Sequence, residues 1–293
     1  MMFTQPYSER LKAAGRLLAQ ADFILIGAGA GLSAAAGLNY QDPDLFRKWY
    51  PQFARLGLNN IWEAIVAHWA PNDDNRRRFW AFWSHHIQKV RYDAPPGTPY
   101  LHLSRLVAGK PHFVITTNVD AQFAKTGFLP DRLFTPQGDY GKFQCAVPCR
   151  ETLHDNRGLV QNLITNMDDA SVLVRDSDIP RCPACGDYLE RNLRRDGHFV
   201  ESTHMEKQPA YAEFLNRSST GRLVLLELGV GFNTPEIIRR PFQAITARHP
   251  RASLLRVNVD DATVPAEIEH RSIAFTEDAA QVLYDLLNQP PTR

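Results

Sequence analysis

The stretch FILIGAGAGLSAAAGLNY, residues Phe23–Tyr40, decides the fold. Its first residues, Phe23–Ile26, form a short apolar run before a glycine-rich loop, which is typical of a buried parallel strand. Glycine lacks a Cβ, so this backbone can turn tightly and lie close to a ligand. The helix expected next offers free N–H groups and a positive dipole end to a pyrophosphate. We therefore predict a dinucleotide site at Gly27–Ser33, although the GxGxG spacing also fits a plain strand–helix turn.

Three later apolar runs have the same character, at Phe113–Thr116, Leu223–Leu228 and Ser253–Val259. Helical patterns separate them, and Thr234 and Pro235 are good N-cap and first-turn residues for one helix, expected to run through residue 247. Strands that alternate with helices predict an α/β fold with a doubly wound, Rossmann-like parallel sheet. We assign to this domain the residue ranges 1–41, 100–140 and 220–293.

Two insertions with a different composition are expected to form a smaller domain. Residues 42–99 repeat aromatic and apolar side chains at helical spacing and predict a helical insertion. Residues 141–219 contain all the cysteines and many polar residues, so we expect a zinc-binding insertion with a poor core. The residues that define the helical repeat are Trp49, Trp62, Ile65, Trp69, Phe79, Phe82, Trp83 and Ile87.

Composition excludes some classes of partner. The 293 residues carry a net charge of +1, which gives no electrostatic case for binding nucleic acid or an anionic membrane. The sequence contains no apolar stretch long enough to span a bilayer, and its first residues lack the apolar core of a signal peptide. We therefore expect a cytoplasmic protein.

The four cysteines form two close pairs, Cys145-x3-Cys149 and Cys182-x2-Cys185. Each pair fits one turn, and two such turns can assemble a tetrahedral thiolate site for Zn²⁺. Such a site has no open position, so its expected role is structural: it holds together an insertion without a core. Four unrelated buried cysteines are the alternative, and His154 is a possible competing ligand.

Several segments together resemble one family. GAGAGLS at 27–33, TTNVD at 116–120 and LGVGFNTP at 228–235 stand at strand ends, with the four-cysteine module between the last two. This arrangement resembles the sirtuins, NAD-dependent enzymes with a Rossmann-type large domain and a small domain of helical and zinc-binding parts. With QGDYG, FQC-x3-C and CP-x-CG, the set is similar to the macrodomain-linked, class M sirtuins of microbes.

The resemblance implies a cofactor site. NAD phosphates are expected at the glycine loop, nicotinamide at Thr117–Asp120, its ribose at Gly229–Gly231 and the adenine ribose at Asn258. The expected cofactor-binding residues are Gly27, Ala28, Gly29, Leu32, Ser33, Tyr40, Gln41, Thr117, Asn118, Asp120, Gln137, Gly229, Val230, Gly231, Phe232, Asn233, Asn258 and Val259.

The departures from the deacylating sirtuins concern the chemistry. The Gly-Ile-Pro-Asp-Phe-Arg segment is missing after the glycine loop, the peptide-clamping Phe-Gly-Glu is missing after Cys185, and Gln137 occupies the place of the catalytic His. An amide does not titrate and cannot act as the base that deacylation needs. Transfer of ADP-ribose depends more on orientation and electrostatic support. We therefore expect Asn118, Asp120 and Gln137 to be the catalytic residues of a transferase.

By the same resemblance, the enzyme is a protein ADP-ribosyltransferase. The implied acceptor is a lipoylated carrier similar to the glycine-cleavage H protein, and a macrodomain hydrolase is the implied partner that removes the mark. The alternatives are an NAD-dependent deacylase, an NAD glycohydrolase and a non-enzymatic NAD or ADP-ribose sensor. Without the resemblance, Asn118 and Asp120 fit a helix start and Gln137 fits a turn equally well.

Overall fold

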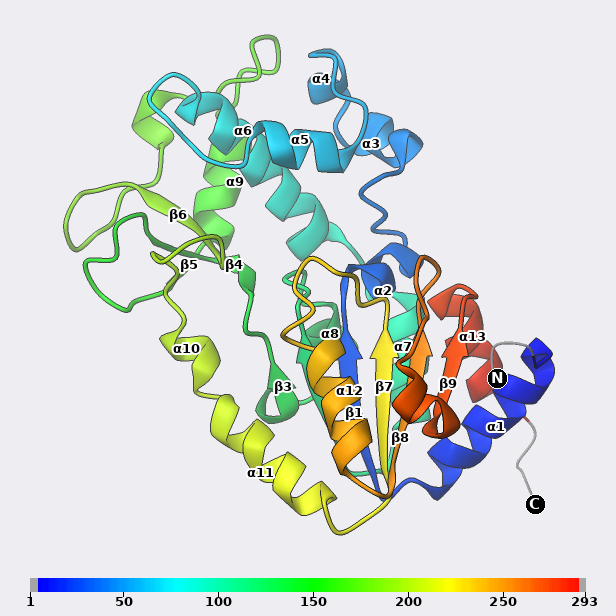
Figure 1. Ribbon diagram of the computed structural model, residues 1–293. Coiled ribbons are helices and arrows are strands. Elements are labelled where there is room, and N and C mark those ends of the chain that lie inside the picture. The colour runs from blue at the N-terminus through cyan, green and yellow to red at the C-terminus, as the bar shows by residue number, and fades with distance from the viewer. Residues whose placement is uncertain (1–4, 290–293) are drawn as a thin grey trace.

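The computed structural model describes residues 5–289 and contains a six-stranded sheet with a smaller domain above its carboxyl ends (Figure 1). The strand order is β3-β2-β1-β7-β8-β9, and all neighbouring strands are parallel. This confirms the predicted doubly wound, Rossmann-like sheet. The strand order reverses at β1 and β7, the place where such sheets bind ligands. The strands are β1 (Phe23–Ala28), β2 (His112–Thr116), β3 (Leu133–Phe134), β7 (Leu223–Leu228), β8 (Ala252–Val257) and β9 (Ser272–Phe275).

Helices cover both faces of this sheet, as Figure 1 shows. Side chains alternate along β1, so Ile24 and Ile26 point to one apolar cluster and Leu25 points to the other. The first cluster lies under α1 (Tyr7–Gln20), α7 (Thr98–Leu106) and α13 (Ala279–Leu287). The second lies under α11 (Gln208–Ser218), α12 (Arg239–Arg248) and η5 (Ala266–Arg271).

Two details differ from the sequence-based expectations. Helix α12 begins at Arg239, so the start predicted at Thr234 is wrong, and turns occupy the residues between. Helix α11 falls in the range assigned to the zinc-binding insertion, yet its Phe214 packs on the large sheet. The remaining short helices of the large domain are α2 (Ala30–Ala35), α8 (Gln122–Lys125) and η3 (Pro130–Arg132). Within residues 5–289, we find no helix with the length and apolar character needed to cross a membrane.

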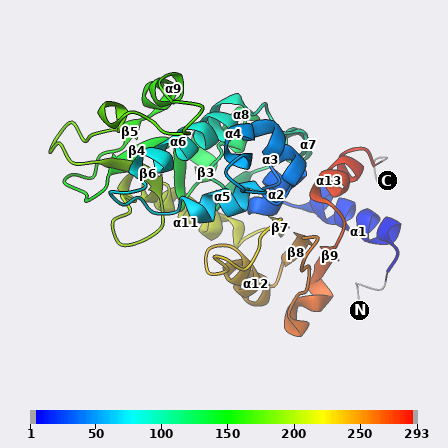
Figure 2. The ribbon, with the colours of Figure 1, turned by 90° about the horizontal axis from the view of Figure 1, so that it is seen from above.

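The small domain combines helices with a three-stranded antiparallel sheet of order β5-β4-β6. Figure 2 shows the strands β4, β5 and β6 to one side of the large sheet, away from α1, α13 and β9. The first insertion supplies α3 (Pro43–Trp49), α4 (Pro51–Ala54), α5 (Ile61–Ala67), α6 (Arg76–Ile87) and the π-helical η2 (Gln88–Asp93). The second part supplies β4 (Gly138–Cys145), β5 (His154–Asp155), α9 (Arg157–Thr165), η4 (Asp176–Asp178), β6 (Leu189–Leu193) and α10 (Ser202–Met205).

The two insertions share one core. Phe143 on β4 lies edge-on against Trp80 on α6, with ring centroids 4.9 Å apart, and Val160 and Leu163 on α9 belong to the same buried cluster. Cys145 and Cys182 also lie at this cluster. The zinc-binding insertion was expected to have a poor core, and only that part of the expectation is wrong. Its apolar side chains are few along the sequence, and they gain a core by packing on the aromatic residues of the helical insertion.

Candidate functional site

The glycine loop is joined to the loop after β7. The backbone N–H of Gly29 donates to Leu228 O, and that of Gly31 donates to Gly229 O, both at 3.0 Å. A Cβ on Gly31 would lie 2.6 Å from Gly229 Cα, and a Cβ on Gly229, whose φ is +60°, would lie 2.4 Å from Leu32 N. The GxGxG spacing thus serves a close backbone approach at the reversal point of the sheet, in addition to any contact with a ligand.

A buried polar cluster lies beside this junction. The side-chain amide of Asn118 donates to Gly29 O at 2.9 Å and to the hydroxyl of Tyr100 at 3.1 Å. The Ser33 hydroxyl lies 2.8 Å from that of Tyr100 and donates to Asp120 at 2.5 Å. The structure therefore brings together four predicted residues, Gly29, Ser33, Asn118 and Asp120. Tyr100, on α7, was missed because no local sequence pattern distinguishes it from a core tyrosine.

Asp120 is almost fully buried, and burial raises the pKa of its carboxyl above the ordinary value. The Ser33 hydroxyl and the backbone N–H of Gln122 oppose that rise by donating to the carboxylate. The next residue, Ala121, has a left-handed φ of 59°, which is uncommon for a residue with a side chain. Together with Asn118, Asp120 lines a cavity of about 250 Å³. A positive charge bound against this carboxyl would favour its ionised form.

Gln137 follows the edge strand β3, next to the strand that leads to Asn118. Its carbonyl accepts a hydrogen bond from Arg194 N at 3.0 Å. Three residues later, Tyr140 N donates to Val119 O at 3.0 Å, which ties this segment to the one that contains Asn118. The backbone therefore holds the two segments side by side, and the role of the Gln137 side chain stays a prediction.

Hydrogen bonds from Asn258 and Arg239 hold the loop after β7 in place. The side-chain amide of Asn258 donates to Val230 O at 2.8 Å, and the guanidinium of Arg239 donates to the same carbonyl at 3.4 Å. The ring of Phe232 is 61% exposed and stacks on that guanidinium, with Arg239 Cζ 4.4 Å from the ring centroid. Asn258, expected at a ribose, thus also fixes the loop that carries Phe232.

A fully buried ion pair supports these loops. Glu227 in β7 accepts from Arg256 in β8 at 2.7 and 2.9 Å, and both side chains are fully buried. Burial raises the pKa of the Glu227 carboxyl, while the charges of Arg256 and Arg239 lower it. This network was not predicted, although a single Glu in the apolar run Leu223–Leu228 is a signal for a buried partner.

The other predicted cofactor residues lie around the same end of the sheet. The hydroxyl of Tyr40 is 3.3 Å from the imidazole of His86, a residue that no sequence motif marks. Thr117 N donates to Ala28 O at 3.1 Å, and Leu32 is buried in the core. A Cβ on Gly27 would meet Ile238 on the far face of β1, so Gly27 is required for packing. The exposed members are Gln41, Gly231, Asn233 and Val259.

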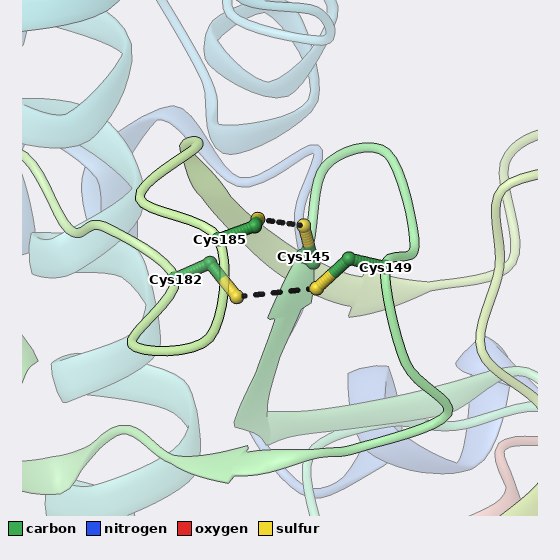
Figure 3. A group of neighbouring side chains, drawn as sticks. All are labelled: Cys145, Cys149, Cys182 and Cys185. Atoms are coloured by element: carbon green, nitrogen blue, oxygen red, sulfur yellow. Dashed lines mark hydrogen bonds between the residues drawn. The ribbon is translucent and has the colours of Figure 1, made fainter.

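The four cysteines converge on one point, as Figure 3 shows. The Sγ atoms of Cys145 and Cys185 are 3.7 Å apart, those of Cys149 and Cys182 are 3.6 Å apart, and all four lie within 4.8 Å of one another. Tetrahedral Zn²⁺ with Zn–S bonds of about 2.3 Å separates its sulfurs by about 3.8 Å. The arrangement therefore fits a closed tetrahedral zinc site.

The electrostatics of these thiols also fit a metal. Hydrogen bonding to Cys185 and Cys182 raises the pKa of the Cys149 thiol to about 12, whereas the N–H groups of Ala184 and Cys185 lower that of Cys182 to about 7. Four adjacent thiolates need a cation to remain ionised together. His154 lines the same hollow, but the described group of close metal-ligand atoms consists of the cysteines.

Comparisons with known proteins agree with this geometry. We find no family model that matches the chain. A protein of Staphylococcus aureus named protein ADP-ribosyltransferase is 31% identical over 275 residues, covering 93% of this chain and 85% of that protein. A probable bifunctional ADP-ribose hydrolase/ADP-ribosyltransferase of Fusarium oxysporum f. sp. cubense is 32% identical over 271 residues, and this chain spans 45% of its length.

Solved structures show the same fold at lower identity. The structure of Sir2Tm bound to a propionylated peptide matches with a TM-score of 0.59 and 20% identity, over 94% of this chain and 97% of that one. The complex of a Sir2 homologue with NAD matches with a TM-score of 0.56 and 15% identity, over 94% and 92% of the two chains.

Proposed function

The chain belongs to the sirtuin family of NAD-dependent enzymes, among its protein ADP-ribosyltransferases, and we propose that it transfers a single ADP-ribose unit from NAD to a protein acceptor. The observation that carries this choice is Gln137, an amide that follows β3 and that, by the resemblance to deacylating sirtuins, takes the place of their titrating imidazole. Losing a general base typically costs a reaction about a hundred- to ten-thousand-fold. Transfer to a positioned nucleophile is penalised less, because orientation and electrostatic support dominate it.

Each polar group of the site has a role in this proposal. NAD supplies the ADP-ribosyl group and nicotinamide as the leaving group. Asn118, held by Gly29 and Tyr100, orients the ribose with its amide. Asp120 places a carboxylate against the positive charge that develops on the sugar, and the Ser33 hydroxyl fixes the carboxylate. Gln137 hydrogen-bonds the ribose hydroxyls.

The acceptor and the partner are the finer part of the proposal. The acceptor is a lipoylated carrier protein similar to the glycine-cleavage H protein, and a macrodomain hydrolase reverses the modification. The name of the Fusarium relative, which joins a hydrolase and a transferase, is consistent with such a pairing. The missing peptide clamp after Cys185 supports an acceptor other than an acyl-lysine peptide.

The test uses labelled NAD with the carrier in lipoylated and unlipoylated forms. We expect label on the lipoylated carrier and loss of label with Asn118→Ala. Gln161→His, at an exposed position on α9, is the control for the Gln137→His variant used below, and it should change the labelling little. Free ADP-ribose without labelled carrier would contradict the transferase and indicate a glycohydrolase. NAD binding without nicotinamide release would indicate a sensor.

A second set of reactions tests the deacylase. Acyl-lysine peptides are incubated with NAD and either the wild-type chain or Gln137→His, which restores a group that titrates near neutral pH. We expect the wild-type chain to leave the peptides intact. Efficient peptide deacylation by the wild-type chain, at a rate above its labelling of the carrier, would replace the transferase by the deacylase.

A further inference from the structure

Three tyrosine hydroxyls meet one buried imidazole in the small domain. His86 on α6 is fully buried, and its Nδ1 lies 2.8 Å from the hydroxyl of Tyr50. Its Nε2 lies 3.3 Å from the hydroxyl of Tyr40 and 3.3 Å from that of Tyr140. Burial lowers the pKa of His86 to about 3, so the ring is neutral and offers one donor and one acceptor. The two nitrogens thus have different partners: Nδ1 contacts one tyrosine, and Nε2 contacts two.

The two tyrosines at Nε2 belong to segments that border the NAD site. Tyr40 ends the stretch that follows the glycine loop, and its carbonyl accepts from Trp62 N at 3.1 Å. Tyr140 lies three residues after Gln137, and its backbone N–H donates to Val119 O, between Asn118 and Asp120. Burial raises the pKa values of both tyrosine hydroxyls, and the nearby charge of Asp120 contributes to both.

Tyr50 provides the internal comparison. Its hydroxyl binds the opposite nitrogen, and its ring stacks on Phe46 with centroids 5.2 Å apart, inside the core of the helical insertion. If His86 only stabilised the fold, losing its contact with Tyr50 would change NAD binding as much as losing its contacts with Tyr40 and Tyr140. A role at the NAD site concerns the Nε2 side alone.

We propose that His86 is a positioning residue, which through Nε2 holds the hydroxyls of Tyr40 and Tyr140 and so fixes the segment after the glycine loop beside bound NAD. The inference rests on the proposed function in one respect, because it concerns the same NAD site. It adds a residue of the helical insertion, together with Tyr140, to the groups that determine the affinity for NAD.

The test compares two single-hydroxyl deletions at the same imidazole, Tyr140→Phe and Tyr50→Phe. The dissociation constant of NAD is measured by calorimetry, KM and kcat by nicotinamide release, and the melting temperature by scanning. We expect Tyr140→Phe to raise the dissociation constant and KM about three- to tenfold, the effect of one hydrogen bond, with kcat within about twofold. Tyr50→Phe lowers the melting temperature and leaves both NAD constants within about twofold.

Two imidazole replacements sharpen the result. His86→Gln places an amide near the Nε2 position and is expected to retain NAD affinity better than His86→Asn, whose amide reaches the Nδ1 position. Equal effects of Tyr140→Phe and Tyr50→Phe on the NAD constants, or an unchanged KM in Tyr140→Phe, would overturn the proposal. A chain that binds NAD and labels no protein contradicts the proposed function, while the dissociation constants still decide the role of His86.

Discussion

The large sheet and the small domain bury their apolar side chains in different ways. The six parallel strands are covered by helices on both faces, and each face has its own apolar cluster. The small domain has one cluster, to which the helical insertion contributes aromatic rings and the strand insertion contributes Phe143, Val160 and Leu163. The large domain therefore resembles a self-sufficient fold, whereas each insertion depends on the other.

The difference has an experimental advantage. All five tryptophans lie between Trp49 and Trp83, in the helical insertion. Tryptophan fluorescence consequently reports on the small domain, while far-UV circular dichroism reports on the whole chain. The two signals can separate the stabilities of the two regions.

Loss of the metal is expected to have the largest effect, and it concerns the small domain. Structural Zn²⁺ supplies roughly 10 kcal/mol or more of folding free energy in small zinc modules. We expect Cys149→Ser, or removal of zinc by a chelator, to shift tryptophan emission to that of exposed indole while much of the sheet signal persists. Added zinc should restore the chelated protein. Unchanged emission in protein with no measurable zinc would show that the shared aromatic core keeps the small domain folded without the metal.

Breaking the buried ion pair is the next largest change, and it concerns the large domain. Removing one partner of a buried pair costs about 3–5 kcal/mol, because the other charge stays buried. We expect Glu227→Ala to lower the urea midpoint measured by circular dichroism and to weaken NAD binding, since the loop with Val230 and Phe232 loses its support. Glu227→Gln should cost less, and Glu236→Ala, at an exposed pair with Arg240, under about 1 kcal/mol. Equal costs for all three would contradict the role of burial.

The third largest effect is expected from a methyl group added where Gly31 packs against Gly229. The Cβ of Gly31→Ala would lie 2.6 Å from backbone of Gly229, and such overpacking costs about 1–3 kcal/mol. Gly158→Ala in α9 of the small domain is the matched control, because a Cβ there meets open space and alanine favours helix. We expect the first variant to lose stability and NAD affinity, and the second to lose neither. Normal NAD affinity in Gly31→Ala would contradict a tight junction.

The smallest effect is an acid sensitivity of the small domain. The pKa of His86 is lowered to about 3 by burial, so the unfolded state, with a pKa near 6.5, binds the proton more readily. Stability from this group is complete above pH 6.5 and falls by about 1.4 kcal/mol for each pH unit below it, until the folded pKa is reached. Unfolding followed by tryptophan fluorescence at pH 7.0 and 5.5 should show this loss, and His86→Gln should reduce it. An identical pH dependence in the two proteins would exclude His86 as the source.

Local patterns identified most of the sheet. Short apolar runs marked β1, β2, β7 and β8, because parallel strands are buried on both faces. The four-residue edge strand β9 was not predicted. The start of α12 was wrong because Thr234 and Pro235 are local capping signals, whereas Arg239 is held by hydrogen bonds to the carbonyls of Val230 and Asp261. A tertiary contact of this kind leaves no mark in the neighbouring sequence.

For the site, too, local motifs predicted the residues that belong to them, and tertiary contacts were not predictable. Asn118 and Asp120 belong to one motif, and the structure brings both to the glycine loop. Tyr100 and His86 approach the same region from α7 and α6. A buried tyrosine and a buried histidine resemble ordinary core residues in a sequence, so their roles depend on distances that only the folded chain supplies.

The pairing of β1 with β7 also has a consequence in time. The backbone N–H of Arg222 donates to Asp22 just ahead of this pairing, between residues 200 positions apart. At about 5–20 residues per second, a ribosome needs about 10–40 s to make the intervening chain. Until then the glycine loop has no Gly229 against which to close, and an apolar strand lacks its neighbour. A nascent chain thus carries the glycine motif long before it has a completed NAD site, and during that interval β1 is a region for chaperones to protect.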